Sequence, residues 1–332
     1  MEEKNNMAFS LEQEKVSYPQ NWPAYDKAQI NEKRLFLKLL YELCQDVEEP
    51  LYKFGRPRLP LRDMLFAAAL KVYSTFSLRR FMTDYAMAVK EGYATKMCSY
   101  RSVSGYMQEE TLTPILRNLI ILSAMPLKSV ETKFAIDSTG FRTNRFTEYC
   151  KDKHKTRQMH QWIKAHVCSG VSTHIITGIE IGDEYSADSL RFIPLVNETA
   201  RIGFEVEEVT ADKAYNSKDN YNAMKELGGQ AYIPFKSNAT GGDRHSRGRA
   251  RLWRKMLQYF IYNREEFMEH YHQRSNIEST FNMIKSKFTD LIRSRDRTAQ
   301  INEILLKVLC HNIVVLLSES KELGIEDSFM RV

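Results

Sequence analysis

The sequence has few of the features that indicate a secreted or membrane-spanning protein. Its 332 residues include only five cysteines, an odd number without a Cys-x-x-Cys pair, which argues against a disulfide framework and fits a reducing compartment. The first residues are charged and polar, and no signal-peptide hydrophobic region is expected there. The longest apolar run, Ile304 to Leu317, is interrupted by polar residues and predicts a buried helix. We therefore expect a cytoplasmic protein without membrane contacts.

Positive charge is present in modest excess but is unevenly distributed. Lysine and arginine number 48 against 42 acidic residues, which gives a net charge of +6. The run Arg244 to Lys255 contains no acid, and two further basic clusters are Arg293, Arg295 and Arg297, and Arg142, Arg145, Lys151, Lys153, Lys155 and Arg157. Concentrated cations favour a polyphosphate partner such as DNA. A solvated surface with local salt bridges is the alternative for any single cluster.

The first third of the chain has helical periodicity only. Residues 1–28 are polar and predict a poorly ordered tail, and residues 29–128 predict an all-helical, DNA-binding domain. The expected helices are 31–47, 61–74, 77–90, 100–107 and 113–124.

Two features of this helical region are candidates for contact with DNA. The segment that contains Arg56 and Arg58 resembles an arm that binds the minor groove, although a stiff linker is the alternative. The helices in residues 77–107 fit either a helix-turn-helix or a packing domain.

The pattern changes at Thr132. Strands are expected at 133–136, 161–168, 174–181, 207–211 and 230–233, and helices at 189–200, 218–227, 264–288 and 299–318. Three successive strands followed by alternating helices and strands indicate a mixed α/β sheet flanked by helices. This α/β domain covers residues 129–320, includes a basic segment at 236–262, and precedes a tail at 321–332.

Three acidic residues form a candidate catalytic site. Asp137 and Asp212 are each expected at the C-terminal end of a strand, where open α/β sheets place their ligands, and Glu278 lies on a late helix. Carboxylates in one cleft repel one another unless a cation neutralises them. Hard oxygen ligands select Mg²⁺ or Mn²⁺, and two such ions about 3.5–4 Å apart can clamp a phosphodiester. We therefore expect all three residues to bind metal.

The helix that carries Glu278 has a distinctive face. At about 100° per residue, Tyr271, Arg274, Glu278 and Lys285 fall within an arc of about 60°. The adjoining apolar stripe consists of Ile277, Phe281, Ile284 and Phe288. The helix can thus bury one stripe while it presents a carboxylate between cations and a phenol, which suits a metal-bound phosphate. A solvated charged face is the alternative for such a helix alone.

At these residues the chain resembles bacterial insertion-sequence transposases of the insertion sequence four/five group. Tyr271, Arg274, Glu278 and Lys285 match the signature Y-x2-R-x3-E-x6-K in residue type and spacing. Segments 134–140 and 210–215 look like the two aspartate motifs of the family, and 162–166 resembles its intervening strand. The resemblance covers roughly residues 130–318.

The resemblance implies an RNase H-like core with an Asp-Asp-Glu triad and two Mg²⁺ or Mn²⁺ ions. Asp137 would bridge both ions, while Asp212 and Glu278 would each complete one metal's coordination shell. Tyr271, Arg274 and Lys285 would hold the terminal-repeat DNA or its scissile phosphate. The further DNA contacts expected are Lys164, His166, Arg247, Arg249, Arg251, Arg254, Arg56 and Arg58.

The implied activity is cleavage of double-stranded DNA at the terminal inverted repeats of an element and joining of the freed 3′-hydroxyls to a target. The resemblance also implies at least a dimer in the complex with DNA, and a cytoplasmic protein associated with the nucleoid. A metal-dependent nuclease of the same fold, a non-catalytic DNA-binding protein derived from a transposase, and a structural α/β protein are the alternatives. Some relatives carry a long β-strand insertion between the second aspartate and the glutamate, but the interval between Asp212 and Glu278 leaves little room for one. Trp253 lies in this interval and fits either base stacking or ordinary packing.

Overall fold

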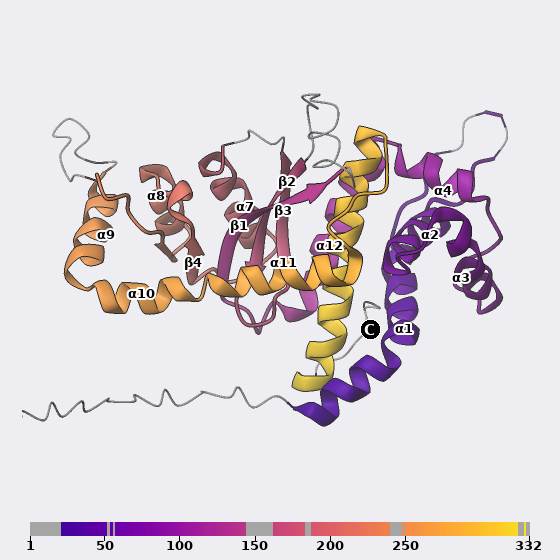
Figure 1. The fold of residues 1–332 in the computed structure, drawn as a ribbon, viewed down its shortest axis with the longest axis horizontal. Helices are drawn as coiled ribbons and strands as arrows, with labels where there is room; N and C mark the ends of the chain where they lie inside the picture. The colour runs from indigo at the N-terminus through magenta and orange to yellow at the C-terminus, as the bar shows by residue number, and fades with distance from the viewer. Residues whose placement is uncertain are drawn as a thin grey trace, which may run out of the picture.

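A mixed five-stranded sheet forms the centre of the protein (Figure 1). The computed structural model describes residues 21–51, 54–55, 57–143, 162–182, 187–239, 248, 250–324 and 329. Within these residues the strands are β1 (Lys133–Arg142), β2 (Trp162–Gly170), β3 (Ile176–Gly182), β4 (Glu208–Ala211) and β5 (Gln230–Tyr232).

The strand order is β3-β2-β1-β4-β5. β1 pairs antiparallel with β2, which pairs antiparallel with β3, whereas β4 runs parallel to β1 and to β5. The first three strands follow one another as a meander, and the last two return through helical crossovers. This is the RNase H-like mixed sheet that was predicted.

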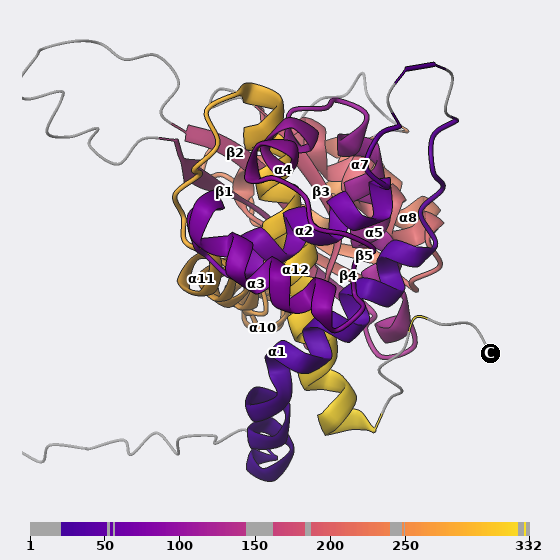
Figure 2. The ribbon, with the colours of Figure 1, turned by 90° about the vertical axis from the view of Figure 1, so that its right-hand side faces the viewer.

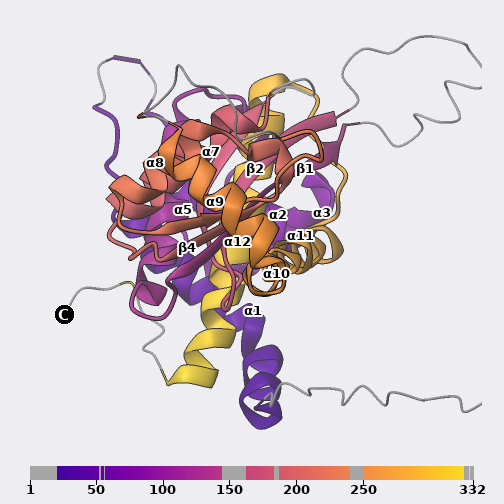
Figure 3. The ribbon, with the colours of Figure 1, turned by 90° about the vertical axis from the view of Figure 1, so that its left-hand side faces the viewer.

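Helices precede the sheet, cover it and follow it. Those before it are α1 (Trp22–Gln45), α2 (Leu61–Tyr73), α3 (Leu78–Lys90), α4 (Tyr100–Met107), α5 (Leu112–Ala124) and the short η1 (Met125–Leu127). Those after β3 are α7 (Ser189–Arg201), η2 (Lys213–Tyr215), α8 (Lys218–Glu226), α9 (Arg251–Tyr262), α10 (Arg264–His272), α11 (Ser275–Phe288) and α12 (Arg297–Leu323). α10 and α11 cross one face of the sheet, and α7 lies on the other (Figures 1 and 3).

α12 joins the N-terminal helices to the sheet. It packs against α1, α2 and α5 as well as β3, and it lies in the middle of the molecule (Figure 2). By length and composition α12 is apolar enough to cross a membrane, but 83 % of its most apolar window is buried inside the protein. Its apolar surface therefore forms a core that the helical region and the sheet share.

Several element boundaries differ from the prediction. α1 begins at Trp22, inside the expected tail, because Asn21 caps it by accepting a hydrogen bond from the Ala24 N–H at 3.2 Å. Pro23 then occupies the first helical turn, where proline is tolerated. Residues 91–99 connect α3 and α4, which is longer than the tight turn of a helix-turn-helix, so that interpretation is dropped. α9 forms a helix within the basic segment, where none was predicted.

Candidate active site

The register of the sheet brings the two aspartates together. Pairing between β1 and β4 ends at Ile136 opposite Ala211. Asp137 and Asp212 directly follow these two residues, so both lie at the same end of the parallel pair. Asp137 nevertheless lies in the middle of its strand, whereas the sequence had predicted it at the end of the strand. β1 continues to Arg142 because β2 provides an antiparallel partner along its whole length.

Asp137 lies in a half-enclosed position among charged groups. Its side chain is 20 % exposed, its Oδ1 accepts the Ser138 N–H at 2.8 Å, and its Oδ2 pairs with Arg274. Burial raises the pKa of Asp137 above its ordinary value, and repulsion from Asp212 and Glu278 raises it further, while Ser138 and Arg274 oppose these effects. Asp212 and Glu278 are therefore close enough to Asp137 to disfavour its ionised form.

Arg274 connects two of these acids. Its guanidinium pairs with Asp137 through Nη1 and donates through Nη2 to Glu278 Oε1 at 3.1 Å. Burial tends to lower the pKa of Arg274, but Asp137, Tyr271 and Glu278 outweigh burial and raise that pKa. The guanidinium carbon lies 5.9 Å from the centre of the Tyr271 ring. Tyr271, Arg274 and Glu278 thus gather beside Asp137.

The helix that was predicted over 264–288 is divided at Gln273 and Arg274, between α10 and α11. The Arg274 N–H donates to Tyr271 O at 2.9 Å, and the Ile277 N–H donates to Arg274 O at 3.0 Å. Both bonds span three residues and tighten the turn here. Tyr271 consequently belongs to α10, whereas Arg274 occupies the position just before α11 and Glu278 lies in the first turn of α11.

Lys285 does not join this group. It lies in the last turn of α11, with its amine 5.8 Å from the centre of the Phe141 ring. Burial lowers the pKa of Lys285, nearby Arg142 lowers it further, and Asp290 opposes both. Arg142 and Asp290 form an ion pair of 2.6 Å. Lys285 therefore lies near the far end of β1, and its predicted contact with DNA would be at some distance from the three acids.

His166 was predicted to contact DNA, and the structure corrects this. Its side chain is 0 % exposed, so no DNA atom can reach it. His166 Nδ1 lies 3.2 Å from the hydroxyl oxygen of Tyr215, and Asp188 is 3.6 Å away. Burial lowers the pKa of His166 to about 4, although Asp188 opposes this shift. Lys164 pairs with the same Asp188.

Tyr215 was not predicted to have a role. Burial raises its pKa, and Asp188, Asp137 and Asp212 raise it further, which places the phenol close to two of the candidate catalytic acids. His166 and Tyr215 therefore form a buried polar layer beneath these acids. The sequence feature that could have indicated a role for Tyr215 is its position three residues after Asp212, at the end of the short turn η2.

The remaining predicted DNA contacts are spread over the molecule. Arg58 pairs with Glu109 at 3.2 Å. Arg251 is exposed at the first position of α9, and Arg254 is partly buried one turn later. Arg56, Arg247 and Arg249 lie outside the described residues.

Trp253 has a packing role. Its Nε1–H donates to Asn216 Oδ1 at 2.8 Å, and its ring meets that of Phe235 edge-on at 5.2 Å. The indole is thus already engaged within the protein, which favours packing over base stacking.

The donor atoms of the three acids suit a hard divalent cation. Carboxylate oxygens are the ligands that Mg²⁺ and Mn²⁺ prefer, and a cation would relieve the repulsion that contributes to the raised pKa of Asp137. Across the described part of the chain, however, no three acidic, histidine or cysteine side chains stand in a ready metal-holding group. Arg274 pairs with one oxygen of Asp137 and one of Glu278, so metal binding requires the guanidinium to shift.

A comparison with protein families agrees with this chemistry. The family model described as the transposase DDE domain matches residues 128–313, which is more than half of the chain. The chain belongs to the transposase DDE domain family. This transposase is therefore a DNA-cutting and strand-transfer enzyme of a family that uses divalent metal ions.

One solved structure and the curated proteins complete the comparison. The solved structure is described as the cryo-EM structure of the piggyBac transposase synaptic complex with hairpin DNA. The two sequences are 10 % identical. The similarity covers 92 % of this transposase and 76 % of the solved chain, with a TM-score of 0.41. No curated protein matches this transposase.

Proposed function

We propose that this transposase is of the bacterial insertion-sequence type that carries the Y-x2-R-x3-E-x6-K signature, and that Asp137, Asp212 and Glu278 are its catalytic carboxylates. It cuts double-stranded DNA at terminal inverted repeats and joins the 3′ ends to a target. The register that sets Asp137 beside Asp212, with Arg274 linking Asp137 to Glu278, is the observation that supports this proposal.

The three carboxylates would hold the divalent ions, two Mg²⁺ or Mn²⁺ by analogy with other phosphodiester-cleaving sites. Such ions, when bound, make the attacking oxygen more nucleophilic and neutralise charge on the leaving oxygen. The Ser138 N–H fixes one oxygen of Asp137 and so orients this carboxylate before any ligand arrives. Pairing of two DNA ends further requires at least a dimer, with one active site for each end.

Arg274 has two roles in this proposal. Without ligands, its guanidinium partly neutralises Asp137 and Glu278 and keeps these acids near one another. When DNA is present, the same planar fork suits two oxygens of a phosphate, and it releases the carboxylates as it turns toward the phosphate. Arg274 therefore positions the scissile phosphate beside the acids.

A strand-transfer assay with duplex oligonucleotides that carry the element's ends tests the proposed function. With Mn²⁺ present, we expect nicked ends and products in which those ends are joined to a second duplex. Cleavage without joined products would contradict strand transfer and indicate a nuclease. Binding of the duplex without any nicking would contradict an active catalytic site.

Exchange of Arg274 for lysine tests its role. Arg274→Lys keeps the charge but cannot bind two partners in one plane, so we expect cleavage to fall by roughly 100-fold, as when a preorganised donor is lost. DNA binding should change by less than about threefold, since the net charge is the same. Arg117→Lys, at a guanidinium that binds Glu180 and Ile179 O, is the matched control. Equal cleavage by the two variants would remove Arg274 from the site.

A further inference from the structure

A second candidate site lies away from the three acids, between the N-terminal helices and the segment that precedes α12. It is a cavity of about 630 Å³ that is bounded by α3, α4 and residues 293–296. Four of the residues that line it are cations from three separate parts of the chain, namely Lys71, Arg79, Arg293 and Arg295. We call this cavity the basic groove.

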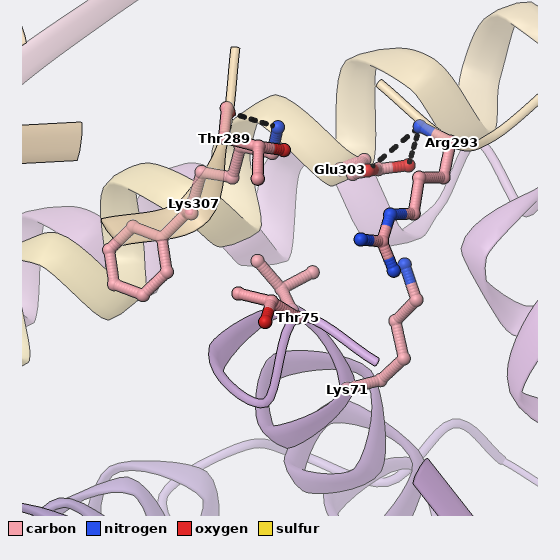
Figure 4. A pocket seen from close by; sticks show the side chains of 8 residues that line it. Lys71, Thr75, Thr289, Arg293, Glu303 and Lys307 are labelled. Atoms are coloured by element: carbon pink, nitrogen blue, oxygen red, sulfur yellow. Dashed lines mark hydrogen bonds between the residues drawn. The ribbon is translucent and has the colours of Figure 1, made fainter. Parts of the chain in front are cut away.

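The protein balances the positive charge of the basic groove only in part, through Asp296 at its rim and Glu303 beneath it. Lys71 is only 5 % exposed, and its amine and the guanidinium of Arg293 point toward one another (Figure 4). Burial lowers the pKa of Lys71, Arg293 lowers it further, and Glu303 opposes these effects. Within the described part of the chain, no carboxylate lies within ion-pair distance of Lys71 or Arg293. A buried cation that faces an exposed one favours a bound anion.

The outer cations of the groove are likewise available. Arg79 and Arg295 are exposed, and neither has an ion pair among the residues that the structure describes. The Arg79 guanidinium lies over the Tyr100 ring, 5.1 Å from its centre. Stacking on the ring holds the charge in place without neutralising it.

Helix geometry adds to this positive field. α3, α4 and α12 all begin at the groove, whose lining includes Ser77, Tyr100 and Asp296 at their N-terminal ends. The N-terminus of a helix carries a partial positive charge and free N–H groups, both of which favour anions. The side chain of Asp296 accepts from the Ala299 N–H at 3.0 Å and so serves α12 as a cap.

A buried charge cluster holds the floor of the groove in place (Figure 4). Glu303 accepts hydrogen bonds from the backbone N–H groups of Arg293 at 3.0 Å and Ser294 at 2.9 Å. Lys307 donates to Thr289 O at 2.8 Å and to Leu291 O at 2.9 Å. The backbone of the segment between α11 and α12 is thereby fixed, and it presents the Arg293 side chain to the groove with less entropy to lose at binding.

From these observations we infer that the basic groove binds the phosphate backbone of double-stranded DNA. The inference rests on the proposed function and adds to it a DNA contact outside the acid site. Cations from three parts of the chain line an open groove, an arrangement that suits successive backbone phosphates better than one enclosed small anion. Glu278, in the first turn of α11, is about 15 Å from Phe288, which lines the buried pocket that shares Lys71 and Arg293 with the groove. This is the length of about four base pairs at 3.4 Å each, so one duplex is long enough to contact both the acids and the groove.

The exposed pair of arginines provides the test, because their exchange leaves the buried cluster intact. R79Q/R295Q removes two charges from the groove. K225Q/R201Q removes two exposed charges from α8 and α7, which lie toward the opposite end of the molecule, and is the matched control (Figure 1). Binding of a duplex without metal is measured by fluorescence anisotropy from 0.05 to 0.3 M salt, and cleavage is measured separately with Mn²⁺.

We expect R79Q/R295Q to bind on the order of 10- to 30-fold more weakly at 0.15 M salt and the slope of log K against log salt to fall by about 1.8, as for two lost phosphate contacts. The control should stay within about twofold of the wild type. Equal affinities and slopes for both double variants would contradict DNA binding by the groove. The same loss of affinity in the wild type on adding excess inorganic phosphate at constant ionic strength would indicate a site for one small anion, and would also contradict it. If wild-type protein neither binds nor cuts duplex DNA, the proposed function itself fails.

Discussion

Asp137→Asn is expected to abolish Mn²⁺-dependent DNA cleavage, with a loss of roughly 1,000-fold or more, as is usual when an essential charged group is removed. The substitution keeps the shape of the side chain but removes the negative charge that a divalent ion requires. Asp137 has two acidic neighbours and pairs with Arg274, so its charge is central to the site. Cleavage of an end-bearing duplex, followed over time on a denaturing gel, measures the effect.

The other two acids and a control complete this experiment. Asp212→Asn and Glu278→Gln should cause comparable losses, while duplex binding by all three variants stays within a few-fold of the wild type. Glu226→Gln removes an exposed carboxylate from α8 and should cleave normally. Substantial cleavage by any one of the three variants would exclude that residue from the catalytic set.

Glu303→Gln is expected to have the largest effect on stability. Glu303 is 2 % exposed, and it accepts hydrogen bonds from the segment that leads into α12. Loss of its charge would remove the main anion that compensates buried Lys71 and Lys307, which costs about 3–5 kcal/mol of the free energy of unfolding. We expect thermal unfolding, followed by circular dichroism, to occur roughly 5–10 °C lower. Glu226→Gln should shift it by about 1 °C or less.

The effect of Glu303→Gln should depend on pH. Burial alone would raise the pKa of Glu303, but Lys71, Ser294, Arg293 and Lys307 reverse this and lower it below the ordinary value. A carboxylate with a lowered pKa in the folded state stabilises the fold above its unfolded pKa and loses this effect as pH falls. The difference in unfolding free energy between the wild type and the variant should therefore be constant near pH 7 and shrink below about pH 4.5. A difference that grew toward acid would contradict this assignment.

The sequence was sufficient to predict the sheet, and it pointed to acids that the fold brings near one another, because each left a local pattern. Alternating apolar residues marked the strands, and Asp212 does follow β4 directly. Asp137 was placed at a strand end because the apolar run stops at Ile136. The strand continues to Arg142 because pairing with β2, a contact between distant segments, supports it beyond the apolar residues. Pairing partners are not visible in a single strand's composition.

Other features depended on packing that no local pattern reports. His166 alternates with apolar neighbours and looked like an outward-facing cation, but α7 and the turn after β4 bury it against Asp188 and Tyr215. The tightened turn at Arg274 lies within a continuous helical periodicity and was therefore missed. The basic groove combines Arg79 with Arg295, which lie far apart in the chain. The arginine cluster 293–297 was visible in the sequence, whereas its proximity to Arg79 was not.

The central claim is that Asp137, Asp212 and Glu278 form one divalent-cation site, and anomalous diffraction from crystals soaked in Mn²⁺ with bound DNA tests it most directly. The account predicts manganese peaks coordinated by Asp137 and flanked by Asp212 and Glu278, with Arg274 turned away from the carboxylates. Saturating Mn²⁺ that gave no peak at these acids, or peaks bound only elsewhere, would contradict it.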